Sequence, residues 1–220
     1  MDKFKNSWFI IPARKGSKGV PLKNRFLIDF TINSIPLELR NKIIVSTDDN
    51  FIIDNLSKKN IKVLKRNSDI SRDETDTKVV IEDVINRSDI KDDDLIFMLY
   101  TVWPERTFKM IEDVFDTFIE NNVKSLLCST EVKTHPYMTF YLKDNNKGKP
   151  LVKHDLYRRQ DYPECFVINH LVTIFETKEL KFLNKQFYND DTYFHPVEEL
   201  INIDSQKDLN NYNKKYQIGD

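Results

Sequence analysis

Short apolar runs alternate along the chain with longer segments in which apolar residues recur at helical spacing. The apolar runs predict strands at 8–13, 42–47, 61–64, 95–99 and 125–129. The segments between them predict helices at 26–35, 50–59, 74–86 and 107–121. Strands joined by helices of this length are typical of βαβ crossovers. The pattern therefore predicts an α/β fold, a three-layer α/β/α sandwich with a mainly parallel, Rossmann-like sheet.

The alternation changes between residues 135 and 160. The side chains of residues 137–142 alternate in character, as is typical of a strand, and the turn-forming run 144–148 follows them. A strand is expected again at 165–175, and a polar helix at 205–216 with Ser205 as its N-cap. We expect a single domain over 1–220 with an inserted arm at about 135–160, of the kind that serves dimerisation or covers a site.

Composition narrows the class of protein. The 34 Lys and Arg residues balance 35 Asp and Glu residues, which argues against binding nucleic acid through bulk positive charge. No apolar run approaches the roughly 18 residues of a membrane span, and the first residues do not resemble a signal peptide. Two cysteines, Cys128 and Cys165, make neither a disulfide framework nor a zinc site. We expect a soluble, cytoplasmic protein without a nucleic-acid or membrane partner.

The loop after the first predicted strand carries the strongest chemical signal. The chain has four glycines, and two of them, Gly16 and Gly19, lie in this loop. Glycines let backbone N–H groups approach an anion, and Ser17 adds a hydroxyl donor. The cations of the loop are Arg14, Lys15, Lys18 and Lys23. The loop is neither a Walker loop nor a dinucleotide fingerprint, so it predicts a polyphosphate site of another kind.

The run IIPARKGSKGVPLKN at 10–24 resembles the nucleotide-binding signature of the acylneuraminate (CMP-sialic acid) cytidylyltransferases. Further segments resemble motifs of that family in the same order along the chain. They are Val45–Asp49, Arg66–Asp73, Pro104–Thr107, Arg158–Asp161 and Ile203–Leu209. The resemblance therefore extends over essentially the whole chain.

The resemblance implies transfer of CMP from CTP to the anomeric hydroxyl of a sialic-acid-like keto-sugar acid, with release of pyrophosphate, for surface glycan synthesis. It also implies Mg²⁺ or Mn²⁺ as cofactor, and a homodimer held by the arm. The nucleotide-binding residues that it implies are Ala13, Arg14, Ser17, Lys23, Asn24, Arg66 and Thr75.

The same resemblance implies residues for the metal, the sugar and the reaction. Asp204 would hold the metal together with Asn202, and the residues that would bind the sugar are Tyr100, Arg159, Gln160 and Asn169. The residues with a part in catalysis would be Arg14, Lys23, Arg158, Arg159 and Asp204. Two alternatives stay open at this point. Asp204 could be an acidic residue at a helix N-terminus, where it would complement the helix dipole. Arg158 and Arg159 could form surface ion pairs with Asp155 or Asp161.

Three positions depart from the family pattern. Tyr100 stands where the family has Gln, Asn202 where it has Asp, and His170 where it has Gly. The first and last of these changes indicate a rebuilt sugar site, and Asn202 removes one metal carboxylate. A cytidylyltransferase with a different acceptor, or a non-catalytic nucleotide-binding homologue, therefore remain alternatives.

Overall fold

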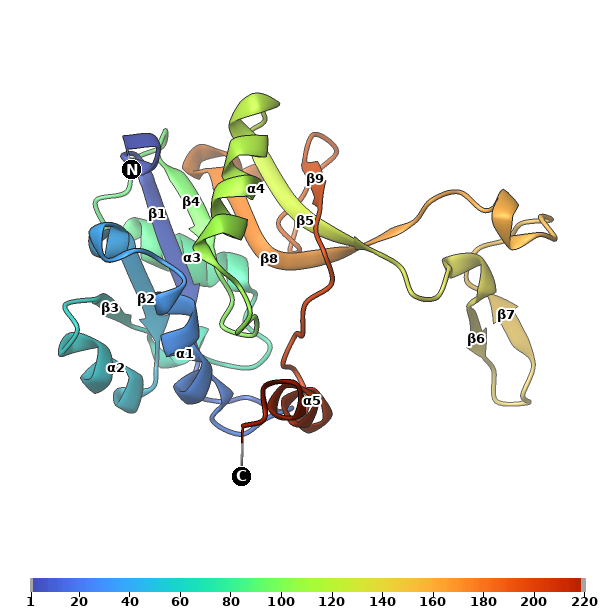
Figure 1. Cartoon of the computed structure of the whole chain (residues 1–220), viewed down its shortest axis with the longest axis horizontal. Coiled ribbons are helices and arrows are strands. Elements are labelled where there is room, and N and C mark those ends of the chain that lie inside the picture. Colours follow the sequence, from blue (N-terminus) through green and yellow to red (C-terminus); the bar gives the residue numbers. More distant parts are fainter. Residues whose placement is uncertain (1, 219–220) are drawn as a thin grey trace.

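A seven-stranded sheet in the order β3-β2-β1-β4-β8-β5-β9 forms the centre of the computed structural model, which describes residues 2–218 (Figure 1). The strands of this sheet are β1 (Ser7–Pro12), β2 (Ile43–Thr47), β3 (Lys62–Lys65), β4 (Leu95–Met98), β5 (Ser125–Glu131), β8 (Phe166–Glu176) and β9 (Tyr193–Pro196). Neighbouring strands run parallel, except that β8 lies antiparallel between β4 and β5. The predicted α/β fold with a mainly parallel sheet is confirmed.

Helices cover both faces of the sheet. One face packs against α1 (Lys23–Asn33), α2 (Asn50–Ser57) and α4 (Phe108–Glu120), and the other against α3 (Thr77–Asn86) and the 3-10 helix η6 (Thr177–Phe182). The remaining 3-10 helices are η1 (Asp2–Phe4), η2 (Leu37–Lys42), η3 (Ser68–Ile70), η4 (Pro136–Met138) and η5 (Arg159–Asp161). Among residues 2–218, no helix combines the length and the apolar character that crossing a membrane requires.

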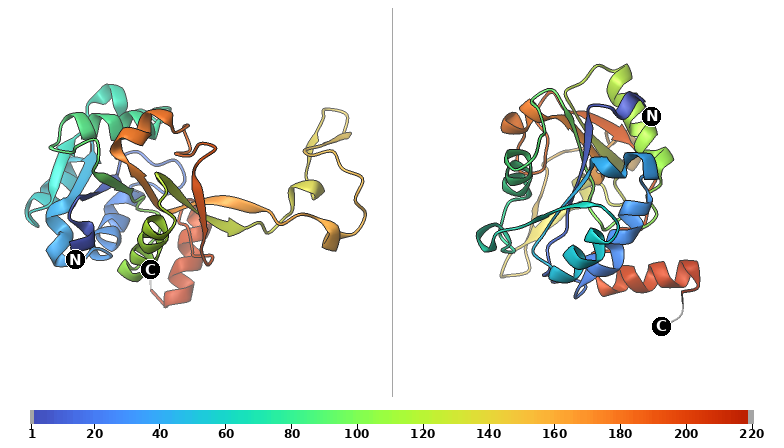
Figure 2. Two further views of the ribbon diagram at one scale, coloured as in Figure 1. Left: turned by 90° about the horizontal axis from the view of Figure 1, so that it is seen from above. Right: turned by 90° about the vertical axis from the view of Figure 1, so that its left-hand side faces the viewer.

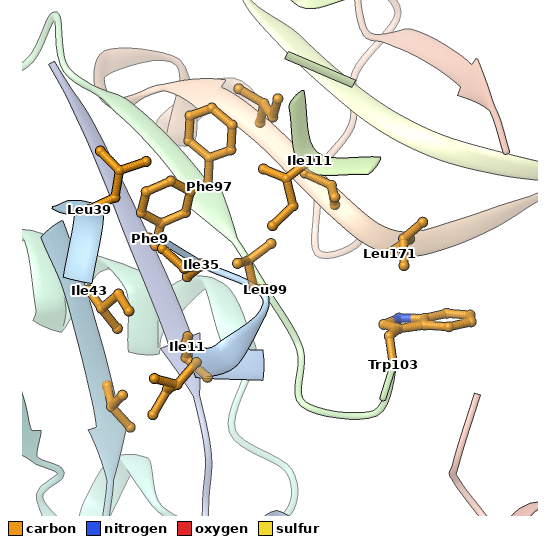
Figure 3. Close-up of a cluster of buried hydrophobic side chains, with 14 of the residues drawn as sticks. Phe9, Ile11, Ile35, Leu39, Ile43, Phe97, Leu99, Trp103, Ile111 and Leu171 are labelled. Atoms are coloured by element: carbon orange, nitrogen blue, oxygen red, sulfur yellow. The ribbon is translucent and has the colours of Figure 1, made fainter. Parts of the chain in front are cut away.

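Aromatic packing dominates the larger core. Phe9 of β1 and Phe97 of β4 lie with their ring centroids 5.1 Å apart, and Ile111 of α4 packs over the same face (Figure 3). Trp103 closes the cluster at the loop after β4 (Figure 3). Burying each such side chain contributes about 1.5–3 kcal/mol, so this cluster fixes the sheet that carries the loops described below.

Side-chain caps set where the helices begin. Asp49 accepts from the N–H of Phe51 at the start of α2, and Asp76 and Thr107 cap α3 and α4 in the same way. The last helix, α5 (Gln206–Tyr216), begins with a capping box in which Ser205 and Asp208 bond each other's backbone N–H. The predicted N-cap at Ser205 is therefore confirmed.

The structure differs from the sequence-based expectation in several places. The strand β9 is not among the predicted strands, and aromatic and polar residues stand in it in place of a continuous apolar run such as that of β4. Helix α1 begins at Lys23 rather than at residue 26, because Leu22 takes the left-handed conformation (φ 57°) that turns the preceding loop into the helix. Asp204 lies in an unpaired segment directly before α5. The N–H of Ile203 in that segment donates to Val102 O (3.0 Å), so the chain crosses there to the loop after β4.

An arm projects from the ends of β5 and β8 (Figures 1 and 2). It carries the hairpin β6 (Phe140–Leu142) and β7 (Gly148–Pro150), and a small aromatic cluster in which Tyr137 stacks on His154 with centroids 4.2 Å apart. The expected core strand at 165–175 begins at Phe166. Its first two residues are about half exposed, because β8 pairs there only with β5 as the two strands extend toward the arm.

Candidate functional site

A cavity of about 960 Å³ opens at the carboxyl ends of β1, β3 and β4. This edge is where ligands bind in open, mainly parallel sheets. The cavity is lined by the loop after β1, the loop after β4, the first half of β8 and the segment that leads to α5. These segments, the loop after β3 and the loop between η6 and β9 therefore meet at one site.

The loop after β1 presents Arg14, Gly16, Ser17, Lys23 and Asn24 to the cavity. Its backbone is anchored on the neighbouring strand, since the N–H of Lys15 donates to Asp48 Oδ1 at 2.7 Å. The predicted polyphosphate loop thus lies in the cavity wall.

Carboxylates neutralise the cations of this loop. Arg14 and Lys18 both pair with Asp73, and Lys23 Nζ lies 2.6 Å from Asp204 Oδ1. The hydrogen bond from Lys18, with further contributions from Arg14, lowers the pKa of Asp73. A polyphosphate that enters the cavity can replace both carboxylates, because its oxygens offer the same cations more negative charge.

Buried polar contacts hold the predicted nucleotide residues in place. Asn24 donates to Arg14 O (2.7 Å) and accepts from Thr101 Oγ1 (2.6 Å). Arg66 donates to Ser46 O (2.9 Å), and burial lowers the pKa of its guanidinium. Both Asn24 and Arg66 line the cavity, as does Thr75.

Ala13 is the one predicted nucleotide residue outside the cavity lining. It is fully buried in the core, and its N–H donates to Ser46 O at 2.9 Å. Ala13 directly follows β1, so its backbone sets the direction in which the loop leaves the strand.

The wall opposite the loop is aromatic and polar. Tyr100 and His170 meet edge to face with centroids 5.6 Å apart, and Asn169 lies beside them on β8. Asn169 Oδ1 accepts from the N–H of Leu171 at 2.8 Å. Burial raises the pKa of Tyr100 and lowers that of His170, which favours the neutral forms of both side chains. This wall offers ring faces and neutral hydrogen-bonding groups.

The sequence profile described as cytidylyltransferase matches residues 8–218. The chain belongs to the cytidylyltransferase family.

Relatives of this chain are named as cytidylyltransferases of N-acylneuraminate and of pseudaminic acid. The N-acylneuraminate cytidylyltransferase of Streptococcus agalactiae serotype V is 28% identical over 206 residues, which cover 89% of this chain and 49% of the relative. The pseudaminic acid cytidylyltransferase of Campylobacter jejuni serotype O:2 is 29% identical over 168 residues, 71% of this chain and 72% of the relative. The chain thus spans about half the length of the streptococcal relatives that it matches.

Solved structures share the fold of this chain. CMP:2-keto-3-deoxy-manno-octonic acid synthetase complexed with CTP superposes with a TM-score of 0.68, covering 96% of this chain and 98% of that one at 11% identity. A 4-diphosphocytidyl-2C-methyl-D-erythritol synthase from Anaerococcus prevotii gives a TM-score of 0.60 at 15% identity, covering 96% of this chain and 98% of that one. At these identities the likeness concerns the fold alone.

The donors near the loop fit a magnesium ion that a nucleotide brings with it. Asp204 supplies an exposed carboxylate, and the buried Oδ1 of Asn202 has no hydrogen-bond partner within the described residues. Residues 2–218 contain no cluster of three or more His, Cys, Asp or Glu that could hold a metal alone. Mg²⁺ commonly takes one or two protein oxygens together with phosphate oxygens and water, which is the donor set available here.

The arm residues lie away from the cavity of their own chain. Arg158 pairs with Asp161 through two hydrogen bonds of 2.9 and 3.0 Å, and Arg159 and Gln160 are exposed in η5. None of the three is among the residues that line the described cavity. The single chain therefore contains the surface ion pair between Arg158 and Asp161, which is one of the alternatives raised by the sequence.

Several cavity residues carried no role in the sequence-based prediction. Asp73 lies at the end of the matched segment 66–73, so the resemblance held a signal for it. Thr101 and Trp103 follow Tyr100 in the loop after β4. None of the family-like segments of the sequence includes these two residues. Lys185 and Gln186 also line the cavity, from the loop between η6 and β9, in which the sequence shows no motif.

Proposed function

We propose that this chain transfers CMP from CTP to the anomeric hydroxyl of a sialic-acid-like keto-sugar acid and releases pyrophosphate, as a step in surface glycan synthesis. One observation carries the proposal: the cations of the phosphate loop share one cavity with Asp204 and with the Tyr100–Asn169 wall. Family membership and the names of the relatives support the reaction class. The proposed setting is the cytoplasm, where the free thiols Cys128 and Cys165 would stay reduced.

In this reaction the anomeric hydroxyl loses its proton to water, and its oxygen forms a bond to the α-phosphorus of CTP. The bond from that phosphorus to the oxygen bridging it to the β-phosphate breaks, and its electron pair leaves with pyrophosphate. Arg14 and Lys23 bind the triphosphate and stabilise the charge that grows on the leaving group. Ser17, Asn24, Arg66 and Thr75 complete the nucleotide site, whereas Tyr100 and Asn169 contact the sugar acid.

The divalent ion, Mg²⁺ or Mn²⁺, would be held by Asp204 and by the amide oxygen of Asn202. When bound, it supplies positive charge to the phosphate oxygens of the leaving group. Lys23 is paired with Asp204 at 2.6 Å, so it already lies where a metal-bound phosphate would need a further cation.

The arm is proposed to join two copies of this chain into a homodimer. Its exposed side chains are unusually apolar: Phe140, Tyr141, Leu142, Leu151 and Tyr157 are all exposed, and Tyr157 is 95% exposed. Exposed apolar side chains gathered in one projecting segment are typical of a protein interface. A second copy could also bring Arg158, Arg159 and Gln160 to a cavity, which they do not reach within their own chain.

The decisive experiment measures pyrophosphate release with CTP, Mg²⁺ and a panel of keto-sugar acids. The panel contains an N-acylneuraminate, pseudaminic acid and 2-keto-3-deoxy-manno-octonic acid, the acids named by the relatives and the solved structure. Release that depends on one of these acids supports the proposal.

Asn202 and Tyr100 favour a second candidate, a non-catalytic homologue that binds nucleotide, because one metal carboxylate and one sugar-binding amide of the family pattern are missing. CTP binding by calorimetry without release on any acid would support that alternative. Release with an acid outside the panel would instead support a cytidylyltransferase with a different acceptor.

A further inference from the structure

The loop between η6 and β9 brings two polar side chains to the aromatic wall of the cavity. Lys185 and Gln186 line the same cavity as Tyr100 and His170. None of the family-like segments of the sequence includes this loop, so neither residue has a role in the function proposed above.

The backbone of this loop is held firmly. Asn184 Oδ1 accepts from the N–H of Gln186 (2.8 Å) and of Tyr188 (3.3 Å), and Phe187 N–H donates to Asn184 O at 3.0 Å. Phe187 has φ of 63°, a conformation that a bulky residue adopts only at an energetic cost. Its ring is buried and stacks on Phe175 with centroids 5.9 Å apart, which offsets that cost. The position of Gln186 is therefore fixed by its neighbours.

His170 orients the side chain of Gln186. His170 Nε2 lies 3.3 Å from Gln186 Oε1, and His170 Nδ1 lies 3.4 Å from Thr173 Oγ1. An amide oxygen only accepts, so Nε2 carries the hydrogen and donates it. The amide NH₂ of Gln186 makes no hydrogen bond within residues 2–218, and its two donors remain for an oxygen of a ligand.

The wall that faces this amide is itself fixed. The buried guanidinium of Arg106 donates to Tyr100 O and to Leu171 O, both at 2.7 Å, and so joins the loop after β4 to β8. Tyr100 replaces the family's Gln on this wall. The chain therefore lacks an amide at position 100 but brings another amide, Gln186, to the adjacent His170.

We propose that Gln186, oriented by His170, is a specificity-determining residue that donates hydrogen bonds to an oxygen of the acceptor sugar acid. Lys185 adds positive charge at the rim that attracts the acid's carboxylate. Its side chain is 85% exposed, and the nearest carboxylate oxygen paired with it within the described residues is 3.9 Å away, on Asp76. This inference rests on the proposed function, because it requires a sugar acid in the cavity.

The test compares Gln186→Ala and Gln186→Glu with wild type in pyrophosphate release, using the acid of the panel that wild type accepts. Gln186→Ala should raise KM for the acid about tenfold and leave KM for CTP within about twofold. Gln186→Glu should raise KM for the acid further. The carboxylate still accepts from His170 but offers no donor and repels the acid. If Gln186 served only to support His170, Gln186→Glu would behave like wild type, and that result would overturn the inference.

Control variants distinguish the loss of Gln186 or Lys185 from the loss of any exposed amide or lysine. Gln206→Ala removes an exposed amide outside the cavity and should change neither KM. Lys185→Ala should raise KM for the acid several-fold at low salt and much less at high salt, whereas Lys181→Ala should not. An unchanged KM for the acid in Gln186→Ala, with normal CTP binding by calorimetry, overturns the inference alone. Wild type that releases no pyrophosphate with any acid overturns the proposed function, and the inference falls with it.

Discussion

Gly19 in the phosphate loop touches the backbone of Asp204, so closely that a Cβ atom at position 19 would lie 1.8 Å from the carbonyl oxygen of Asp204. The glycine is required by this approach and not by its φ angle, since no glycine in the described chain has positive φ. The phosphate loop and the proposed metal ligand are thus positioned by one backbone contact.

Gly19→Ala should separate the loop from the segment before α5. Because the obstacle is backbone, the chain has to shift, and we expect a loss of about 1–3 kcal/mol in the free energy of unfolding together with weaker CTP binding. Urea unfolding and calorimetry measure the two effects. Gly16→Ala is the matched control for stability, since its Cβ would meet only the end of the Arg14 side chain at 3.5 Å. Equal stability of the two variants would contradict the prediction.

Arg14→Ala should weaken CTP binding about 10- to 100-fold. A charge-assisted hydrogen bond to phosphate contributes about 1.5–3 kcal/mol, and Arg14 lines the cavity in the phosphate loop. Calorimetric titration with CTP gives the affinity directly. Lys42→Ala, which removes a cation stacked on Trp8 outside the cavity, serves as the control. An unchanged CTP affinity in Arg14→Ala would exclude the residue from the nucleotide site.

Asp204→Asn should abolish turnover and leave the fold intact. The side chain is 60% exposed and pairs only with Lys23 within the described residues, so its loss costs little packing. Asn202→Asp should preserve or raise the rate, because it restores a second carboxylate to the divalent ion. Pyrophosphate release is measured at saturating Mg²⁺ and again with EDTA. Near-normal turnover of Asp204→Asn, or a rate that EDTA leaves unchanged, would refute the assignment.

Tyr157→Asp should convert the proposed dimer into a monomer at micromolar concentration. Tyr157 is 95% exposed at the apolar end of the arm, and a charge there would be buried without a partner in an interface. Light scattering gives the mass of each variant. Lys147→Asp, a charge change in the polar turn of the hairpin, is the control. Wild type that is already monomeric would count against the dimer.

Asp49→Asn should destabilise the protein by about 2–4 kcal/mol at pH 7 and by much less in acid. Burial opposes the charged form of Asp49, but the hydrogen bonds from Arg25 (2.7 and 3.0 Å) and from the N–H of Phe51 are stronger and lower its pKa. A lowered pKa means that the stabilisation is complete above the ordinary value near 4 and is lost as pH falls through the folded value.

Urea unfolding between pH 7 and pH 2 checks this dependence. Asn keeps an oxygen for the helix cap of α2 but loses both the charge and the second oxygen that accepts from Arg25, so the variant removes the ion pair and spares the cap. Asp54→Asn on the exposed face of the same helix should stay within about 0.5 kcal/mol of wild type at both pH values. A stability gap between Asp49→Asn and wild type that does not narrow in acid would contradict the argument.

The sequence predicted the fold because its strands are continuous apolar runs and its helices have clear apolar faces. Ile81 and Val84, for example, pack on the sheet as their spacing indicates. It also pointed to the loop after β1 that lines the cavity, since Gly16 and Ser17 belong to one contiguous motif. Contiguous motifs of this kind can be recognised in the sequence before the fold is known.

The residues of the opposite cavity wall could not be predicted from local motifs. Gln186 meets His170 only because the loop after η6 folds back beside β8, and Trp103 reaches the cavity only because the chain after β4 turns there. Such contacts depend on tertiary packing between distant segments. The single-domain division of 1–220 and the roles of Arg158 and Arg159 stay predictions.

The strand β8 links the arm to the cavity mechanically. Asn169 and His170 belong to β8, and the same strand continues through Val167 and Phe166 out of the sheet to the arm. Its pairing with β5 shifts register between Leu127 and Cys128, next to Asn169, which gives the ribbon a built-in joint. One continuous strand therefore carries both the base of the arm and the Asn169–His170 wall of the cavity, with the register shift directly beside that wall.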